Sequence, residues 1–385
     1  MIAGKKTKVL FLPVWYPSKF DKVLGIFVKQ HAIALNNSVN LAVYHVCPHL
    51  GLNSIIKFEE VREDGLLVYR AYYWLFQIKV LKPLNWITYF FAGFIGYLKI
   101  LNSWGRPDIN HIHVLTRVGV IALFAKAFQK TPYYITEHWS RYLPERNTYK
   151  GFLRKFLTKL IVSKSSGIST VSECLKIALQ KHELFHENFP IIPNTVNFNI
   201  FKPTTGSFNH QCFRFLHVSG LTDRTKNISG IINACKILKS ESVLFSLHIV
   251  GNYKNKQSLL HYVRELGLES NIHFKGELYG EQLAAEYRKA DTFVLFSFFE
   301  SQSVVLIESF SSGVPVIATA SGGIPEIVNT ENGILTPPGD EKLLAKNMKQ
   351  MIKNKHLYKK DIIRAEAKAR FSYEKVADQF IKFYT

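Results

Sequence analysis

Residues 298–308 read FFESQSVVLIE, and the two glutamates of this stretch stand eight positions apart. The apolar run 304–307 is typical of a helix that begins near Ser303, which leaves Glu300 in the preceding loop and puts Glu308 about two turns away, inside the helix. The first amide groups of a helix have no acceptor within the helix, and they attract anions such as phosphate. The stretch therefore predicts an anion site at a helix start, flanked by two carboxylates.

The rest of the chain alternates short apolar runs with helical segments, a pattern that indicates parallel sheets covered by helices. Candidate strands in the first half are Val9–Leu12, Val39–Tyr44, Leu66–Tyr69, Ile109–His113, Tyr133–Thr136 and Gly167–Val171. Candidate strands in the second half are Phe213–Val218, Phe245–Val250, Ile272–Lys275, Thr292–Leu295, Val314–Ala318 and Gly333–Leu335. We therefore expect an α/β fold with two doubly wound, Rossmann-like domains that face each other across a cleft, where ligands bind at the carboxyl ends of the strands.

The domain boundaries follow from composition. Residues 194–206 form a polar segment with prolines nearby, which is typical of a linker. We expect an N-terminal domain over residues 1–200 and a C-terminal domain over residues 201–371. Residues 372–385 are expected to form a last helix that packs back on the N-terminal domain, because Val376, Phe380 and Phe383 make one apolar stripe.

The formal net charge is +20 over 385 residues, and residues 1–200 carry most of it, with 25 Lys/Arg against 11 Asp/Glu. A basic N-terminal half indicates an anionic partner such as membrane lipid, a phosphorylated substrate or nucleic acid. The four cysteines are scattered, which argues against a zinc or disulfide framework and fits a reducing compartment. Pro13 and Pro17 interrupt the first apolar run, so a buried strand rather than a signal peptide is expected there.

Two apolar segments of the first half leave alternatives open. Residues 83–98 are an uncharged stretch of 16 residues, whereas a membrane-spanning helix needs about 20. A buried helix, with or without an edge that touches a bilayer, is favoured over a spanning one. In residues 152–162, the cations Arg154, Lys155 and Lys159 lie opposite apolar side chains, so this helix either docks at a membrane surface or is an ordinary amphipathic helix on the domain core.

Downstream of the two glutamates, residues 312–316 read SGVPV, residues 322–326 read GGIPE and residues 332–338 read NGILTPP. In this order the segments resemble the family 4, or group 1, glycosyltransferases. Residues 169–172 and 192–197 resemble the family's approach to its interdomain linker, so the likeness extends over nearly the whole chain. It implies a GT-B fold and a retaining transfer of a hexose-type sugar from a nucleotide sugar, in which Glu300 holds the sugar and Glu308 binds the ribose hydroxyls.

The resemblance also implies roles around residue 220. Residues 218–220 with Lys226 resemble the first strand–helix turn of the family's nucleotide-binding domain, where Gly220 approaches the donor and a lysine at the position of Lys226 contacts the diphosphate. The family's arginine, expected directly after Gly220, is Leu221 here. Arg224 is the candidate substitute. The alternative for Lys226 is an ordinary exposed lysine.

In the first domain, Gly25 matches the glycine of a family loop that lies near the donor phosphates and the acceptor, although the paired glycine often found there is missing. A plain turn glycine is the alternative. His138 follows a candidate strand, and the resemblance implies that it approaches the donor sugar. The alternative is a satisfied core histidine. His111 and His113 are expected to be mainly structural, with His113 a minor site candidate.

A departing nucleoside diphosphate gains negative charge, which many transferases neutralise with a metal ion. The sequence contains no Asp-x-Asp and no His/carboxylate cluster with ligand spacing. Amide groups of Ser303 and Val304, together with Lys226 and Arg224, offer the alternative. We therefore expect metal-independent catalysis without a cofactor, with a UDP- or GDP-linked sugar as donor.

The expected partners are a nucleotide sugar, a glycan or lipid-linked acceptor of cell-surface polysaccharide synthesis, and an anionic membrane surface. The expected location is the cytoplasm, with peripheral contact at the inner membrane face. A nucleic-acid-binding protein is disfavoured because no helix-turn-helix, zinc finger or aromatic RNA signature is present. A non-catalytic protein that binds sugar nucleotides and a GT-B epimerase or phosphorylase are the remaining alternatives.

Overall fold

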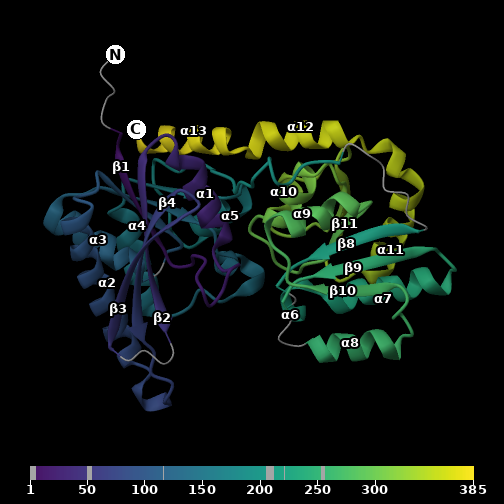
Figure 1. Ribbon diagram of the computed structural model, residues 1–385, viewed down its shortest axis with the longest axis horizontal. Helices are drawn as coiled ribbons and strands as arrows, with labels where there is room; N and C mark the ends of the chain where they lie inside the picture. Colours follow the sequence, from purple (N-terminus) through teal and green to yellow (C-terminus); the bar gives the residue numbers. More distant parts are fainter. Residues whose placement is uncertain (1–5, 50–53, 116, 205–211, 221, 253–255) are drawn as a thin grey trace. The chain divides into compact units, whose positions relative to one another are not determined.

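The computed structural model describes residues 6–49, 54–115, 117–204, 212–220, 222–252 and 256–385 (Figure 1). The chain divides into two compact units. Unit 1 contains Met1–Asn194 and Tyr373–Thr385, and unit 2 contains Thr195–Ser372. The last helix, α13 (Tyr373–Tyr384), is therefore part of unit 1.

Unit 1 is built on a seven-stranded sheet in the order β3-β4-β2-β1-β5-β6-β7. All neighbouring strands are parallel except β3 and β4, which pair antiparallel at one edge. The strands are β1 (Lys8–Pro13), β2 (Asn40–His49), β3 (Ile56–Glu63), β4 (Leu66–Trp74), β5 (Ile109–His113), β6 (Tyr133–Glu137) and β7 (Gly167–Thr170). The six strands predicted for this half are confirmed, and β3 is an addition to them.

Helices cover both faces of this sheet. Alternate residues of β1 point to opposite faces and therefore lie in two different cores. Leu10 and Leu12 face a core shared with α2 (Leu84–Ser103), α3 (Val118–Gln129), α4 (Phe152–Ser163) and α5 (Glu173–Lys181). Val9 and Phe11 face a second core, shared with α1 (Ile26–Asn36) and α13. The stripe of Val376, Phe380 and Phe383 on α13 is buried in that second core, where α13 lies along α1.

Unit 2 contains a six-stranded, wholly parallel sheet in the order β10-β9-β8-β11-β12-β13. The strands are β8 (Phe213–Val218), β9 (Phe245–Val250), β10 (Ile272–Gly276), β11 (Thr292–Leu295), β12 (Val316–Thr319) and β13 (Gly333–Thr336). All six were predicted from sequence and are confirmed.

Helices again form a layer on each face of the second sheet (Figure 1). One core includes residues of α9 (Gly280–Lys289), α10 (Val304–Ser311) and α12 (Lys360–Phe371). The other includes residues of α7 (Ile228–Ser240), α8 (Lys256–Glu265) and α11 (Glu341–Asn354). A short helix, α6 (Asp223–Lys226), follows β8. Both units are thus doubly wound α/β layers, as the sequence predicts.

The apolar segment of the first half is the helix α2, which is long and apolar enough to cross a membrane by length and composition. In this fold its inner side is packed on the sheet. Gly93 and Gly96 approach Ile121 and Tyr44 so closely that a side chain at either position would collide with them. The Tyr44 hydroxyl donates to the backbone carbonyls of Ala92 and Gly93, at 2.9 Å each. The helix is therefore a core helix on one side, while its other side is exposed.

Candidate active site

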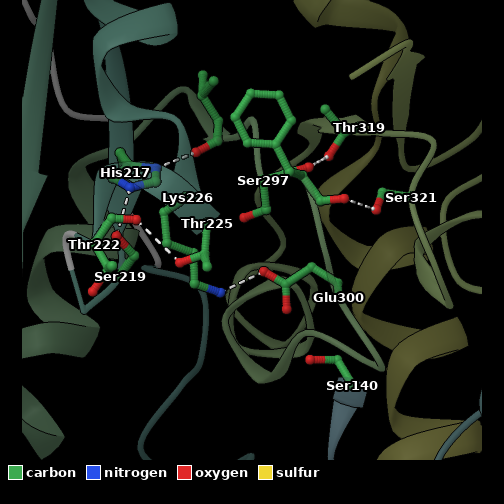
Figure 2. A network of polar contacts seen from close by, with 12 residues as sticks. Ser140, His217, Ser219, Thr222, Thr225, Lys226, Ser297, Glu300, Thr319 and Ser321 are labelled. Carbon is green, nitrogen blue, oxygen red and sulfur yellow. Dashed lines mark hydrogen bonds and ion pairs between the residues drawn. The ribbon is translucent and has the colours of Figure 1, made fainter. Parts of the chain in front are cut away.

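The loop between β11 and α10, residues 296–303, contains Glu300 and lies at the carboxyl edge of the second sheet. The hydroxyls of Thr319 and Ser321, at the end of β12, donate to the carbonyls of Ser297 and Phe298, at 2.7 Å each (Figure 2). The Phe298 amide donates to the carbonyl of Thr225 on α6, at 2.9 Å. The loop is therefore fixed from two sides, by the neighbouring strand and by the helix that contains Lys226.

Gly322 lies directly against the backbone of this loop. Its φ of +55° is in the left-handed region, and a Cβ at this position would lie 1.7 Å from the backbone oxygen of Glu300. The next residue, Gly323, donates its amide to the same oxygen at 3.2 Å. Only glycine fits here, because both the backbone conformation and the contact exclude a side chain.

Lys226 and Glu300 point toward each other from α6 and the loop (Figure 2). The Lys226 Nζ donates to Glu300 Oε1 at 2.5 Å, the Glu300 side chain is largely buried and the Lys226 side chain is half-buried. The two residues are separated by 74 positions in the chain, so only the fold brings them together. This charge-assisted bond leaves a lysine ammonium and a carboxylate at the carboxyl edge of the sheet, where parallel α/β sheets bind ligands.

Glu308 lies in α10, about two turns after the loop. The Tyr287 hydroxyl is 3.0 Å from Glu308 Oε2 and 3.0 Å from the Val305 carbonyl oxygen. Burial raises the pKa of Glu308 to about 8, and the hydrogen bond from Tyr287 offsets part of this rise. The carboxyl group is therefore mostly protonated at neutral pH. Ligand groups that donate hydrogen bonds to its ionised form would lower its pKa and favour ionisation.

The start of α10 lies between the two glutamates. Ser303 is its N-cap residue, with an extended backbone, and is buried, while Val304 is the first helical residue. The amide groups of the first helical turn have no acceptor within the helix and coincide with the positive end of its dipole. The predicted sequence of carboxylate, helix start and carboxylate is thus present as one continuous segment of unit 2.

The turn after β8 contains the other candidates. Gly220 is exposed, and a Cβ there would meet nothing within 4 Å, so space exists beside its backbone. Arg224 is exposed on α6. Leu221, which stands at the family's arginine position, lies outside the described residues. Lys226 is the cation that contacts Glu300, whereas no contact within the described residues assigns Arg224 to the loop.

His217, on β8, is a positioning residue that the sequence did not single out. Its Nδ1 is 2.9 Å from the Val294 carbonyl oxygen and its Nε2 is 2.8 Å from the Ser219 hydroxyl (Figure 2). Because a carbonyl only accepts, Nδ1 carries the proton and donates. Burial lowers the pKa of His217 to about 4, so the ring is neutral and joins β8 to β11 beside the Lys226 helix. A histidine inside an apolar strand is the only signal in the sequence.

In unit 1, Gly25 is the residue before α1 and has a φ of +75°. A Cβ there would lie 2.2 Å from the backbone carbonyl of Trp15. The glycine is therefore required where α1 begins against the backbone that follows β1. This requirement accounts for the residue by packing alone, and a substrate role for the loop is a separate proposal.

His138 follows β6 at the carboxyl edge of the first sheet, as the sequence predicts for its position. It is 5% exposed. Its Nε2 lies 3.1 Å from Nδ1 of His113, and its ring lies between those of Phe27, His31 and His113. Burial, reinforced by the neighbouring His31 and His111, lowers the pKa of His138 well below its usual value. The imidazole is therefore neutral at physiological pH.

Glu137, the neighbour of His138, is a second residue that sequence reasoning missed. Its carboxylate accepts hydrogen bonds from the amides of Leu115, His138 and Trp139, at 2.7, 2.8 and 2.7 Å. Burial raises the pKa of Glu137 to about 7, and these amide donors oppose the rise. With three donors converging on it, the carboxylate ties the loop after β5 to the backbone of His138. The only indication in the sequence was that Glu137 directly precedes the candidate residue His138, in the run TEHW.

The ring nitrogens of His31, His113 and His138 lie within 4.8 Å of one another, a grouping that could hold a metal ion. The sequence showed no such cluster, because its members come from α1, β5 and the segment after β6, and their spacing has no ligand pattern. His113 and His138 are hydrogen-bonded to each other, and Nε2 of His31 lies 2.9 Å from the Pro193 carbonyl oxygen. These bonds engage one nitrogen of each ring, and burial lowers the pKa of all three histidines, so the grouping is a neutral core.

Residues 207–376 match the family described as glycosyl transferases group 1. Mannosylfructose-phosphate synthase of Agrobacterium fabrum is 25% identical over 297 residues, which cover 71% of this chain and 63% of the relative. A Campylobacter jejuni enzyme, N-acetylgalactosamine-N,N'-diacetylbacillosaminyl-diphospho-undecaprenol 4-alpha-N-acetylgalactosaminyltransferase, is 27% identical over 276 residues, covering 70% of this chain and 74% of the relative.

Solved structures share the fold over nearly the whole chain. Sucrose-phosphate synthase from Thermosynechococcus elongatus superposes with a TM-score of 0.78 at 19% identity, covering 98% of both chains. HepE of Anabaena, in complex with UDP-glucose, has a TM-score of 0.74 at 18% identity, covering 98% of this chain and 99% of its own. The fold is thus that of GT-B proteins. The match over residues 207–376 relates the C-terminal part of this chain to the group 1 glycosyltransferases.

Proposed function

We propose that this chain is a retaining, metal-independent hexosyltransferase that moves a sugar from a UDP- or GDP-linked donor to a glycan or lipid-linked acceptor of cell-surface polysaccharide synthesis. Unit 2 binds the donor and unit 1 the acceptor, and the protein works in the cytoplasm at the inner membrane face. The observation that carries the proposal is the Lys226–Glu300 ion pair beside the start of α10, with Glu308 further along the same helix.

The first step assigned to these residues is binding of the diphosphate. The amide groups of Ser303 and Val304 offer hydrogen-bond donors at the positive end of α10, and Lys226 supplies a full positive charge. Without donor, Glu300 neutralises that charge at 2.5 Å. Entry of a diphosphate gives Lys226 a second anionic partner, so the lysine can stabilise the charge that grows on the leaving group. Arg224 and the open space beside Gly220 extend this binding region.

The two carboxylates are assigned to the two sugars of the donor, which are the transferred hexose and the ribose. Glu300 is held rigidly by its backbone contacts, and it accepts hydrogen bonds from hydroxyls of the transferred sugar and stabilises positive charge on that ring. Glu308 accepts hydrogen bonds from both ribose hydroxyls. In unit 1, the neutral imidazole of His138 is assigned to a sugar hydroxyl, and Gly25 to the loop that receives the substrate.

The comparisons support this assignment at a coarser level. The relatives include enzymes named as a mannosyltransferase, an alpha-monoglucosyldiacylglycerol synthase and an N-acetylgalactosaminyltransferase whose name gives an undecaprenol-linked acceptor. HepE has been crystallised with UDP and with UDP-glucose. These ligands and acceptors belong to those proteins, and the UDP-glucose of HepE is a donor of the class proposed here.

The proposal is tested first by thermal stabilisation with UDP-, GDP- and ADP-linked sugars. A donor present at a hundredfold excess over its Kd stabilises the folded state by about 2.7 kcal/mol. Transfer is then followed with the donor that binds, and proton NMR of the product reports the anomeric configuration. We expect retention, with transfer abolished in Glu300→Gln and Glu308→Ala. Near wild-type turnover in both variants, or an inverted product, would refute the assignment.

A further inference from the structure

We propose that one end of unit 1 is a docking surface for an anionic lipid bilayer, formed by the 3-10 helix η1 (Lys79–Leu81) and the first turns of α2 and α4. We call it the lipid-facing surface. Its apolar members are Val80, Trp86, Ile87, Phe91, Phe152 and Phe156, and its cations are Lys79, Lys82, Arg154 and Lys155. The inference adds a defined surface and lipid class to the proposed function, and its geometry does not depend on the transfer chemistry.

Exposure of large apolar side chains is the first observation. Val80 is 84% exposed, Ile87 64% and Phe152 87%. At the start of α4, every residue from 151 to 156 is exposed, although this stretch reads GFLRKF. Soluble surfaces seldom gather so many aromatic and aliphatic side chains, and a surface rimmed by polar groups that does so is usually a contact site.

The helices α2, α3 and α4 form one layer on the sheet. α2 contacts α3 through Phe94 and Phe124, whose rings are 4.9 Å apart, and Gly119 of α3 lies against Ile161 of α4. α2 connects β4 to β5 and α4 connects β6 to β7, and all four strands are parallel through β2 and β1. Both helices therefore begin at the carboxyl edge of the sheet. The exposed side chains of their first turns are thus at the same end of unit 1 as Gly25 and His138.

The charge of the layer identifies the occupant. The sequences of α2, α3 and α4 contain no aspartate or glutamate. Lys79, Lys82, Arg154 and Lys155 are exposed beside the apolar side chains. Cations interleaved with aromatic and aliphatic groups fit anionic lipid headgroups and the acyl region just below them. Nucleic acid could contact the cations and the aromatic rings, but it has no apolar region that would bury the aliphatic side chains of Val80 and Ile87.

The helix α2 lies on the bilayer in this proposal and does not cross it. Its opposite side is buried through Tyr89, Gly93, Gly96 and Tyr97, and Tyr44 is hydrogen-bonded to its backbone. Spanning would require breaking this core. A surface contact at the carboxyl edge instead brings the candidate residues of unit 1 close to the headgroup region, where the head of a lipid-linked acceptor would be.

The test is sedimentation of the full chain with vesicles of phosphatidylcholine alone and of phosphatidylcholine with phosphatidylglycerol. Two variants remove parts of the surface: Ile87→Ser with Phe152→Ser, and Arg154→Gln with Lys155→Gln. Matched controls change equally exposed residues elsewhere, Phe185→Ser with Leu244→Ser, and Lys342→Gln with Lys346→Gln. Thermal unfolding and nucleotide-sugar binding are measured on every variant.

We expect binding to the anionic vesicles, weakened by about tenfold or more in each surface variant, with the controls and nucleotide-sugar binding unchanged. Loss of transfer with intact vesicle binding would count against the proposed function alone. Absence of binding to anionic vesicles would overturn the docking surface, as would equal weakening by the controls. If the wild type did not bind vesicles and the surface variants abolished self-association, the surface would instead be assigned to contact with a second copy of the chain.

Discussion

Glu308 combines a buried carboxyl with a proposed role, binding of the ribose hydroxyls, that requires negative charge. Its pKa is raised to about 8 by burial, so the donor-free protein holds a proton there at pH 7. Two ribose hydroxyls that donate to the ionised form lower this pKa, and donor binding at pH 7 therefore releases a proton. Isothermal titration of a nucleotide sugar in buffers of different ionisation enthalpy measures that release. We expect up to one proton released near pH 7 and little above pH 9.

The matched control for this prediction is Glu308→Gln, which has the same shape and no titration. Proton release at pH 7 should disappear in this variant. The glutamine does not titrate, and the diphosphate of a nucleotide sugar does not titrate near neutrality either. Proton uptake by the wild type, or identical release in both proteins, would contradict the ribose assignment of Glu308.

Lys226 and Arg224 provide a second contrast between single residues. Lys226 contacts Glu300 at 2.5 Å, whereas Arg224 is exposed on the same short helix. Loss of one charge-assisted donor to a leaving group costs on the order of 10²-fold in rate. We expect this loss in kcat/KM for Lys226→Met, and a smaller loss for Arg224→Gln. The reverse order, measured by steady-state kinetics, would make Arg224 the family arginine's functional replacement.

For single residues, the sequence indicated which side chains are candidates for the site better than it indicated which of them contact each other. Glu300, Glu308 and Lys226 could be proposed as site residues because ordered motifs surround them. The Lys226–Glu300 bond, the Tyr287–Glu308 bond and the His31–His113–His138 grouping join residues from separate elements, and spacing along the chain contains no information about them. Glu137 and His217 were missed for the same reason, since their roles consist of backbone contacts made across strands.

Among the elements, the Gly322–Gly323 turn determines where the Glu300 loop lies. Gly322→Ala would place a methyl group 1.7 Å from the Glu300 oxygen and would strain a φ of +55°. We expect lost nucleotide-sugar binding and a destabilisation of about 1–3 kcal/mol from the backbone strain alone. Thermal unfolding and ligand binding of the purified variant measure both.

Gly280→Ala separates the two causes. Gly280 has a similar φ of +50°, but a Cβ there meets nothing within 4 Å. This control should lose stability to backbone strain and retain nucleotide-sugar binding. If Gly322→Ala binds the donor as Gly280→Ala does, the turn does not position the loop.

The elements themselves were largely predictable. Buried parallel strands are continuous apolar runs, and all the predicted ones are present. The strand β3 was missed because its sequence, IKFEEVRE, mixes charges with apolar residues. Such a pattern suits an exposed edge strand, and only the neighbouring β4 shows that it pairs. The segment 84–101 shows the opposite limit, since its composition alone could not separate a core helix from a membrane span, whereas its packing against Tyr44 and Ile121 does.

For the whole molecule, the proposal requires transfer without a metal ion, since an ammonium group and helix amides neutralise the leaving group. We expect wild-type turnover after exhaustive treatment with EDTA and no stimulation by Mg²⁺ or Mn²⁺. Activity lost to the chelator and restored by either ion would refute this mechanism. Restoration by Zn²⁺ alone, with the metal bound in stoichiometric amount, would point to the grouping of His31, His113 and His138.

The most direct measurement is a crystal structure of the chain with its preferred nucleotide sugar. We expect the diphosphate at the start of α10 within hydrogen-bond distance of the Lys226 ammonium, the ribose on the Glu308 carboxylate and the transferred sugar on Glu300. A donor bound away from both carboxylates, with the Lys226–Glu300 pair undisturbed, would contradict it.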